Sequence, residues 1–579
     1  MILFPPALYP QSRMAVFIVP FLANYAFYQH AGAYGGEFAS HFVLLHTWSL
    51  AVEEQFYLLF PLLMLVIWRF LGRRFLAVLG LLALVSLLLC VVAVRVAPLA
   101  TFYLPQFRAW ELLAGAMLAV GKFTPPRAAR ARGGIALLGL LLILAADLLF
   151  SYGTPYPSEF TLLPCMGAIA ILYAACNETE PMGRVLANPV MRRVGMWSYS
   201  IYLYHWPLWV LAQYYAFDPL STLSRCILFA ITLVLAALSW RYVEQPFRGS
   251  NALLKRPAAY GLAAVSGVVL MLAALYLHHF ADSSRYNPRE RTLFAADTAV
   301  QQQCRNTSPE RTQRPPCILG DATAPVRAIL WGDSHALAFL PAVDAAYAEH
   351  HEAVMFAQQG GCPALPGVVI RDSKPAQSRL LHAWLEAAGY GRSENCKQHT
   401  DAVLDWIIQH HIHTVILAGH WIAYTEARNL RWLTDSENPD NVSLRDNAAI
   451  FSRGLERLLA ALQREKVQVF ILDDAPQNTV DVPYALASAR RRDWDRDFRI
   501  SRAEYDAQQH SATEVFARLQ KQYAFQVLEP QNSLCAGGKC AISRGDVSLY
   551  ADEEHLSAPG AMVAKPALEP IWAGEISRQ

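Results

Sequence analysis

The sequence predicts a polytopic α-helical membrane domain followed by an extracytoplasmic α/β domain with a mostly parallel sheet. Three observations support this prediction. Apolar runs recur up to about residue 280, basic residues occupy alternate loops between them, and beyond residue 280 short apolar runs alternate with helical patterns. The 579 residues are 54% hydrophobic and 17% charged, with a formal net charge of +2. This near-neutral charge argues against a protein that binds nucleic acid electrostatically.

Nine apolar runs are candidate membrane spans. They cover residues 14–29, 45–69, 75–98, 108–122, 133–152, 160–176, 197–216, 224–243 and 257–279. Two of them, 14–29 and 108–122, are shorter than the ~20 residues that a helix needs to cross the hydrocarbon core. The evidence for these two spans is therefore weaker than for the rest.

Basic residues are concentrated in every second loop. Lysine and arginine follow the second, fourth, sixth and eighth spans, as in Arg73-Arg74 and Arg192-Arg193. The other loops contain neither residue: 30–44, 99–107, 153–159 and 217–223. By the positive-inside rule the even-numbered spans end in the cytoplasm. The ninth span then delivers the chain beyond residue 280 to the outer side of the membrane.

The ten cysteines divide at the same point. Four lie in or beside apolar runs, where cysteine usually behaves as a small hydrophobe: Cys90, Cys165, Cys176 and Cys226. The remaining six suit disulfides in an oxidising compartment. Of about fifteen connectivities, the simplest joins neighbours in sequence: Cys304–Cys317, Cys362–Cys396 and Cys535–Cys540. No CxxC metal spacing is present.

Five apolar runs in the C-terminal part predict buried parallel strands with helices between them. They are residues 326–332, 353–357, 414–418, 467–472 and 525–528. Before them, residues 280–325 are rich in Pro, Gln, Thr and Arg and predict a linker clipped by Cys304 and Cys317.

The span after His46 begins with a polar turn, HTWSLAVEEQFY, where a membrane helix usually begins with leucines. Helical spacing places His46 and Glu53 on one stripe, with Glu54 beside it. A carboxylate near the bilayer centre costs about 2.5–3.5 kcal/mol on insertion scales. These glutamates therefore either lie in the headgroup layer or line a polar active-site wall.

Two short motifs in the C-terminal domain predict a nucleophile and its base. Trp331-Gly332-Asp333-Ser334-His335 follows the first strand and opens a helical pattern, so Ser334 lies at a strand-to-helix turn near free amide groups. Asp552-Glu553-Glu554-His555 predicts a helical turn on which Asp552 orients His555 as a base toward Ser334. By itself, a GDSH sequence is typical of an ordinary helix cap. The combination of GDSH with a late DxxH motif is a more specific indication of a nucleophile and its base.

On these motifs the C-terminal domain resembles the SGNH hydrolase family, which has its serine in a GDS motif and its Asp and His in a late DxxH motif. The resemblance implies that Ser334, Asp552 and His555 are catalytic. The family takes oxyanion donors from a glycine and an asparagine. Gly361 is placed to be the glycine, whereas Gly419-His420 stands where the family has its asparagine. His420 or a backbone amide is the expected substitute.

Four segments of the N-terminal part together resemble the acyltransferase-3 family of membrane acyltransferases, over about residues 14–250. They are HTWSLAVEEQFY; FRAWE with Arg108 and Glu111; SYSIYLYHWP with His205; and YVEQPFR with Arg241 preceding it. A fused SGNH domain is a known architecture in that family. Members begin with further helices that carry an arginine-rich motif and a catalytic histidine, and we expect this chain to start after them.

The resemblance implies four regions. These are an acyltransferase-3-like domain at 1–256, N-terminally incomplete, a further span at 257–279, a linker at 280–325 and an SGNH-like domain at 326–579. It implies transfer of an acyl group from cytoplasmic acetyl-CoA to a hydroxyl of a bacterial surface polysaccharide such as lipopolysaccharide O-antigen. The protein would lie in the inner membrane with its C-terminal domain in the periplasm. His46, Glu53 and Glu54 would act in the membrane, supported by Arg108 and Glu111.

Other functions stay open at this point. A membrane-anchored carbohydrate esterase would use only the C-terminal motifs, an inactive truncated homologue would use neither site, and an export or scaffold component would need no catalysis. No bound cofactor, metal or nucleic acid is expected. The cluster His410, His411 and His413 predicts an exposed helix end rather than a zinc site, because no further ligands stand at suitable spacing.

Overall fold

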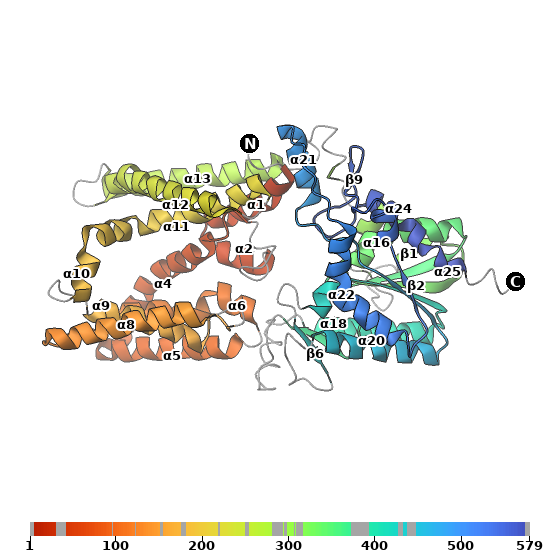
Figure 1. The fold of residues 1–579 in the computed structure, drawn as a ribbon. Helices are drawn as coiled ribbons and strands as arrows, with labels where there is room; N and C mark the ends of the chain where they lie inside the picture. The colour runs from red at the N-terminus through yellow and green to blue at the C-terminus, as the bar shows by residue number, and fades with distance from the viewer. Residues whose placement is uncertain are drawn as a thin grey trace. The chain divides into compact units, whose positions relative to one another are not determined.

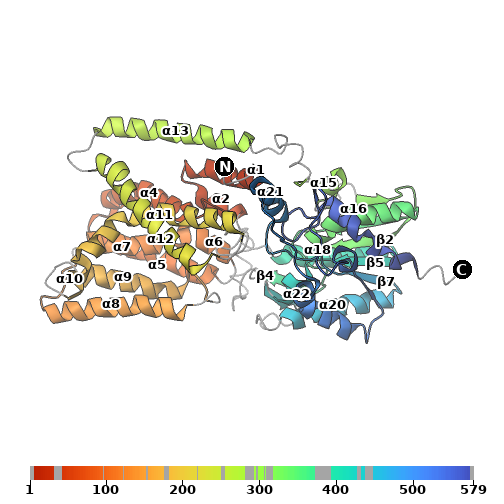
Figure 2. The same ribbon diagram turned by 45° about the horizontal axis from the view of Figure 1, so that its top comes forward.

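The computed structural model places the described residues in two compact units, one made of the residues up to 280 and one of the residues from 293 onward. It describes residues 5–30, 42–94, 97–121, 123–150, 154–174, 181–217, 220–248, 254–280, 293–294, 298–305, 307, 317–371, 393–426, 432–436 and 447–573. Cys176 and part of the predicted linker lie outside these residues. Figures 1 and 2 show a helical N-terminal unit and a C-terminal unit built on a sheet.

The N-terminal unit consists of helices that match most of the predicted spans. The helices are α1 (Pro5–Ile18), α2 (Ala23–His30), α4 (Thr47–Leu71), α5 (Phe75–Ala93), α6 (Pro98–Tyr103), α7 (Ala109–Val120), α8 (Ala129–Leu149), α9 (Leu162–Ala174), α10 (Pro181–Ala187), α11 (Pro189–Ala216), α12 (Thr222–Ser239) and α13 (Arg256–Phe280). After α12 the chain continues through a π-helical turn, Trp240–Glu244, and a 3₁₀ turn, Gln245–Phe247.

Five helices of the described chain are long and apolar enough to cross a membrane. They are Thr47–Leu71, Phe75–Ala93, Ala129–Leu149, Thr222–Phe247 and Pro257–His279. Their large apolar side chains remain exposed, as with Trp68 at 73% and Phe70 at 77%, which is expected of a surface that meets lipid. α7 and α9 are shorter apolar helices.

The prediction of a single span at 14–29 is wrong. The chain there breaks at residues 19–22 between α1 and α2, and Phe21 has a φ of +57°. An apolar cluster includes Met14 of α1, Phe27 of α2 and Trp48 of α4, so these short helices pack on the start of α4.

The C-terminal unit has a six-stranded sheet in the order β1-β3-β2-β5-β7-β8. The strands are β1 (Cys317–Gly320), β2 (Val326–Gly332), β3 (Ala353–Gln358), β5 (Thr414–Ala418), β7 (Gln468–Leu472) and β8 (Gln526–Leu528). All neighbours are parallel except β1, which runs antiparallel to β3. The mostly parallel sheet and its five predicted strands are confirmed within one residue at each end.

The segment 280–325 is not simply a linker. β1 belongs to the sheet, and α15 (Ala299–Cys304) packs on α16 (Ser334–Glu349). Sequence reasoning missed β1 because its four residues carry too short an apolar pattern. It also missed two small antiparallel pairs, β4 (Val368–Arg371) with β6 (Trp432–Asp435) and β9 (Ser543–Arg544) with β10 (Val547–Ser548).

Helices cover both faces of the sheet. α16 and α24 (Ala558–Ala564) lie over one face, and α18 (Ser393–Gln409), α20 (Asn447–Arg464) and α22 (Arg502–Leu519) cover the other (Figures 1 and 2). The side chains of each strand alternate between the faces, so Ile329 and Trp331 of β2 join the core formed with α18, α20 and α22. The smaller elements are α19 (Trp421–Thr425), α21 (Val482–Arg492), α23 (Gln531–Leu534) and α25 (Pro570–Ala573).

The three disulfides join the cysteines that are neighbours in sequence. Cys304 is bonded to Cys317, Cys362 to Cys396, and Cys535 to Cys540. The simplest of the predicted connectivities is therefore the one in the structure.

Candidate active site

The candidate site of the C-terminal domain lies at the carboxyl ends of the parallel strands, where an open α/β sheet usually binds its ligand. β2 ends at Gly332, and the next two residues are Asp333 and Ser334. β5 is followed by Gly419-His420, and β7 by Asp473-Asp474. Because these strands neighbour one another in the sheet, their following residues come together.

The turn that carries Ser334 depends on a close approach between two strands. A Cβ at Gly332 would lie 1.7 Å from the carbonyl oxygen of Ala418 in β5, so no larger residue fits there. Asp333 caps α16 by accepting a hydrogen bond from the amide of His335 at 2.8 Å. Its other oxygen accepts from the amide of His420 at 3.0 Å and from the hydroxyl of Tyr424 at 2.5 Å. The fully buried Asp333 thus locks the nucleophile turn to the β5 loop.

Ser334, His555 and Asp552 form a hydrogen-bonded triad. The Nε2 atom of His555 lies 2.9 Å from the Oγ of Ser334, and its Nδ1 atom lies 2.8 Å from Oδ2 of Asp552. The serine and the other two residues are 218 or more positions apart in sequence, so the fold assembles the set. These distances suit proton transfer from the serine to an oriented imidazole.

The Asp552–His555 segment is not a helical turn, contrary to prediction. Residues 551–555 form a series of bends before α24. Oδ1 of Asp552 accepts hydrogen bonds from the amides of Glu554 and His555 at 2.8 and 2.7 Å, so the side chain organises its own loop. Burial alone would raise the pKa of Asp552, but the hydrogen bonds from His555 and these amides lower it. The carboxylate therefore stays ionised beside the imidazole.

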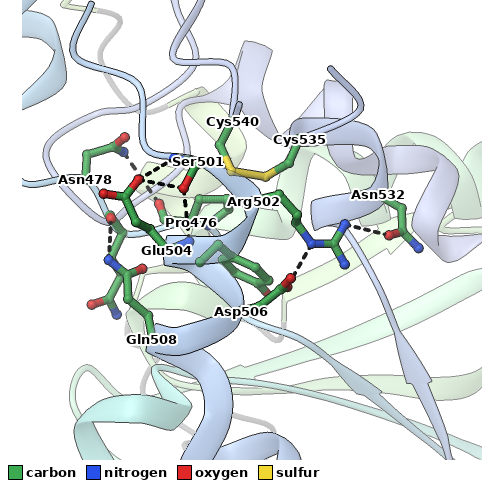
Figure 3. The surroundings of a disulfide bond; sticks show 12 residues. Pro476, Asn478, Ser501, Arg502, Glu504, Asp506, Gln508, Asn532, Cys535 and Cys540 are labelled. Carbon is green, nitrogen blue, oxygen red and sulfur yellow. Dashed lines mark hydrogen bonds and ion pairs between the residues drawn. A yellow bond between two sulfur atoms is a disulfide. The ribbon is translucent and has the colours of Figure 1, made fainter. Parts of the chain in front are cut away.

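The loop after β7 closes over the DxxH segment. The amide of Asn478 donates to the carbonyl of Glu553 at 2.8 Å, and the side-chain amide of Gln508 in α22 donates to the carbonyl of Gln477 at 3.1 Å. Figure 3 shows Asn478 and Gln508 near the start of α22, where the Cys535–Cys540 disulfide lies next to Ser501 and Arg502. Bonds from α22 and the DxxH segment therefore hold this loop in place beside the triad.

The two predicted oxyanion residues differ in outcome. Gly361 has a φ of +70°, and its loop lies beside the nucleophile turn because the amide of Gln359 donates to the carbonyl of Gly332 at 3.3 Å. Its role as a donor stays a prediction. His420 is not an amide donor to an oxyanion, since its N–H is bonded to Asp333. The His420 ring contacts the side-chain amide of Gln477 and stacks on His335.

The membrane motifs meet around Tyr202 of α11, a residue that sequence reasoning did not single out. Its hydroxyl lies 2.5 Å from the Oγ of Ser49 and donates to the carbonyl of His46 at 2.8 Å. Its ring contacts the rings of His46 and His205. His46 is buried at 2% exposure, directly before α4. Tyr202 lies in the SYSIYLYHWP segment. The sequence signal that could have identified it was an aromatic hydroxyl within a predicted membrane helix.

The predicted carboxylates and arginine border this cluster. Glu53 and Arg108 both lie within electrostatic range of Tyr202, and Glu54 within that of Tyr199. The side chains of Glu53 and Glu54 are half-buried, so other residues of the protein partly cover them.

Arg108 sits in an aromatic box. Its guanidinium lies 5.1 Å from the ring centre of Trp48 and 5.7 Å from those of Phe102 and Tyr156, and it donates to Glu111 at 2.9 Å. Arg108 and Glu111 thus support one another and the start of α4. The YVEQPFR motif is linked to α11, because the hydroxyl of Ser200 donates a hydrogen bond to the carboxylate of Glu244 in the π-helical turn.

Among the residues that the structure describes, two groups offer metal-ligand atoms within 4.8 Å of one another: His335 with Glu554 and His555, and His335 with His420 and Asp474. Both nitrogens of His555 are already engaged by Ser334 and Asp552. One nitrogen of His335 is engaged by Asp474. We therefore assign no metal to these groups. The exposed His410, His411 and His413 follow α18 and are not part of either group.

A serine bonded to a histidine that is bonded to a carboxylate, at the strand ends of a parallel sheet, defines a serine-hydrolase type of site. Comparison with known proteins agrees. Residues 303–570 match the family described as "SGNH domain (fused to AT3 domains)", and residues 9–241 match the acyltransferase family Acyl_transf_3. The chain therefore belongs to the acyltransferase-3 proteins that carry a fused SGNH domain.

Several curated proteins are similar over part of their length. A putative membrane-bound transacylase, BcsY, of Komagataeibacter xylinus is 30% identical over 45% of this chain and 66% of that protein. The peptidoglycan O-acetyltransferase OatA of Listeria monocytogenes is 27% identical over 39% of each chain. The O-acetyltransferase OatA of Staphylococcus aureus is 27% identical over 47% of each chain. The chain thus spans less than two thirds of these relatives.

One solved structure also matches, that of the periplasmic domain of a lipopolysaccharide acetyltransferase from Salmonella ser. Paratyphi A. It aligns with 52% of this chain and 100% of that chain at 11% identity, with a TM-score of 0.34.

Proposed function

We propose that the protein is an O-acetyltransferase that moves an acetyl group from cytoplasmic acetyl-CoA to a hydroxyl of a bacterial cell-surface polysaccharide. The observation that carries the proposal is the assembled Ser334–His555–Asp552 triad in a chain that also has an acyltransferase-3 domain. The names of the Listeria and Staphylococcus relatives describe O-acetylation, which supports the reaction class. Lipopolysaccharide O-antigen is the acceptor that we expected from the family resemblance.

The triad can perform the transfer in two steps. In the first, the Oγ of Ser334 attacks the acetyl carbonyl while His555 takes the serine proton. The bond between the acetyl carbon and the donor group then breaks, and His555 gives the proton to the departing donor group. In the second, His555 takes the proton of a sugar hydroxyl, whose oxygen attacks the acetyl-serine. The C–O bond to Ser334 breaks, and His555 gives the proton back to the serine. Asp552 keeps the imidazole oriented throughout.

The membrane domain would supply the acetyl group. The polar residues around Tyr202, together with Glu53 and Arg108, provide charged and hydrogen-bonding groups within a helical unit that is rich in apolar side chains. Such groups are costly in a membrane and usually mark a pathway or a site. The basic loops support an orientation in the inner membrane with the C-terminal domain in the periplasm.

The test is acetylation of surface polysaccharide in cells that express the full chain or its Ser334→Ala variant. Base-labile acetate is released from purified polysaccharide and quantified. We expect Ser334→Ala to lose more than about 90% of the acetate, because removal of a triad nucleophile costs several orders of magnitude in rate. Ser533→Ala, a half-buried serine in α23, is the matched control and should retain the wild-type level.

Unchanged acetylation in Ser334→Ala would overturn the proposal and favour a scaffold role. A carbohydrate esterase would give the opposite sign, because expression of the wild-type chain would lower the acetate of an already acetylated polysaccharide and Ser334→Ala would restore it.

A further inference from the structure

Glu554 places a carboxyl group beside the base of the triad. One of its carboxyl oxygens lies within 4.8 Å of a ring nitrogen of His555. The two side chains reach solvent to a similar degree, with 26% of the Glu554 side chain and 25% of the His555 side chain exposed. A molecule that approaches His555 from solvent therefore has Glu554 within reach.

The triad itself fixes the backbone of Glu554. The amide of Glu554 donates to Oδ1 of Asp552 at 2.8 Å. The amide of Ala551 donates to the carbonyl of His555 at 2.8 Å, which closes the bend that contains Glu554. Because the backbone is held at these points, the Glu554 side chain starts from a fixed place beside His555. A ligand that binds there loses little affinity to the ordering of the loop.

The protein leaves the hydrogen-bonding capacity of this carboxyl group unused. In the part of the chain that the structure describes, its ion-pair contact is with Nε2 of His420 at 3.6 Å, which is too long for a hydrogen bond. The His420 ring also contacts the side-chain amide of Gln477. By contrast, Asp333 and Asp552 each accept hydrogen bonds from backbone amides. Glu554 is thus the carboxyl group of this site that is placed to bind a ligand hydroxyl.

The acceptor of the second step must bring one hydroxyl to His555. That hydroxyl gives its proton to His555, its oxygen bonds to the acetyl carbon, the bond from this carbon to Ser334 breaks, and Ser334 takes the proton. Hydroxyls on adjacent carbons of a sugar ring are about as far apart as two hydrogen-bonded oxygens. A sugar held at His555 can therefore reach Glu554 with the hydroxyl next to the reacting one.

We propose that Glu554 binds the acceptor through a hydrogen bond between its carboxyl group and the hydroxyl adjacent to the one that is acetylated. The proposal rests on the proposed function of the triad, and it narrows the acceptor to compounds with neighbouring hydroxyls. A hydroxyl both donates and accepts, so the contact forms with the carboxylate and with the protonated carboxyl group. Because a sugar offers this second contact and water does not, Glu554 favours transfer over hydrolysis.

The test compares two acceptors that differ by one hydroxyl. The full-length protein in detergent receives p-nitrophenyl acetate as donor and either trans-1,2-cyclohexanediol or cyclohexanol as acceptor, and the acetylated alcohol is quantified by gas chromatography. We expect the kcat/KM of the wild-type protein to be about tenfold higher for the diol, after correction for its two equivalent hydroxyls. The reason is that cyclohexanol lacks the hydrogen bond to the carboxyl group.

Two variants assign the preference to Glu554. Glu554→Met removes the hydrogen-bonding atoms at similar length, and the preference for the diol should fall to about twofold or less. Glu554→Gln keeps a hydrogen-bonding amide and should retain a larger preference than Glu554→Met. The ratio of the two acceptors is measured within each variant, so a general loss of activity from altered packing cancels. Glu514→Met, which changes an exposed glutamate of α22, is the matched control and should keep the wild-type ratio.

Three results would overturn the proposal. They are equal kcat/KM values for the two alcohols in the wild-type protein, a wild-type ratio in Glu554→Met, and hydrolysis of the donor without acetylation of either alcohol.

The proposed function fails separately. If Ser334→Ala consumes p-nitrophenyl acetate as fast as the wild-type protein, the triad is not the site of ester chemistry. If Ser334→Ala abolishes the reaction while Glu554→Met keeps the preference for the diol, only the role of Glu554 is wrong.

Discussion

At the scale of single residues, carboxylates that accept hydrogen bonds from backbone amides hold the triad in place. Asp333 binds two amides and a tyrosine hydroxyl, and Asp552 binds two amides of its own loop. Both carboxylates organise backbone around the reacting atoms. Preorganisation of this kind is what allows a site to stabilise developing charge without reorganising during the reaction.

Glu553, next to Asp552, predicts how the stability of the domain depends on pH. Burial, followed by the charge of Asp552, raises the pKa of Glu553 from 4.5 to about 8. Between these pH values the folded state holds a proton that the unfolded state has lost, so the free energy of unfolding falls as pH rises through this window. Glu553→Gln removes this loss and should raise the free energy of unfolding by about 1–3 kcal/mol at pH 8.

Urea unfolding followed by tryptophan fluorescence at pH 5 and pH 8 measures this effect. The gain should be largest at pH 8 and small at pH 5. Glu569→Gln, which alters another glutamate of the same domain, is the control. An equal change at both pH values would show that Glu553 is not titrating in this window.

At the scale of elements, the strands were readily predicted and the connecting loops were not. A buried parallel strand gives a continuous apolar run, as in Val326–Gly332. The position of Ser334 follows from that strand. Sequence reasoning assigned the DxxH segment to a helical turn because an Asp–His spacing of three fits both a helical turn and an irregular loop. Only the hydrogen bonds from backbone amides to the Asp552 side chain distinguish the two structures.

Two residues beside the candidate sites escaped sequence reasoning for a related reason. Asp474 follows a predicted strand, yet its partner His335 is 139 residues away, and no local pattern reports such a contact. The carboxyl ends of neighbouring parallel strands were the available signal, because residues that follow them meet. Tyr202 contacts Ser49 from 153 residues away and gave no periodic signal either.

The packing of α8 against α9 gives a prediction at this scale. A Cβ at Gly139 would lie 2.6 Å from the carbonyl of Gly167 and 2.9 Å from Ile171, so the two helices touch through their backbones. Small residues at such contacts are typical of membrane helix pairs. Gly139→Val should separate the helices and lower the melting temperature of the purified protein in detergent by several degrees, about 5 °C.

Gly134→Val is the matched control, because a Cβ at Gly134 meets nothing within 4 Å. It lies in the same helix and carries the same propensity cost. Equal melting temperatures for the two variants would show that the α8–α9 contact does not contribute to stability.

At the scale of the whole molecule, two units with separate cores carry two polar sites. Division at residue 282, close to the predicted end of the ninth span, agrees with the change in composition along the chain. Loop charges and disulfides point to the same orientation, because three disulfides suit an oxidising compartment and the basic loops suit the cytoplasm. A donor on one side and an acceptor on the other would give each unit its own half-reaction.

The most direct test of this central claim is to trap the acetyl group on its way to the acceptor. The full chain is reconstituted in proteoliposomes, given isotope-labelled acetyl-CoA without acceptor, quenched in acid, digested and examined by mass spectrometry. We predict a labelled acetyl ester on Ser334 that disappears when polysaccharide is added and is absent in Ser334→Ala. Label transferred to polysaccharide by Ser334→Ala at the wild-type rate would contradict the claim.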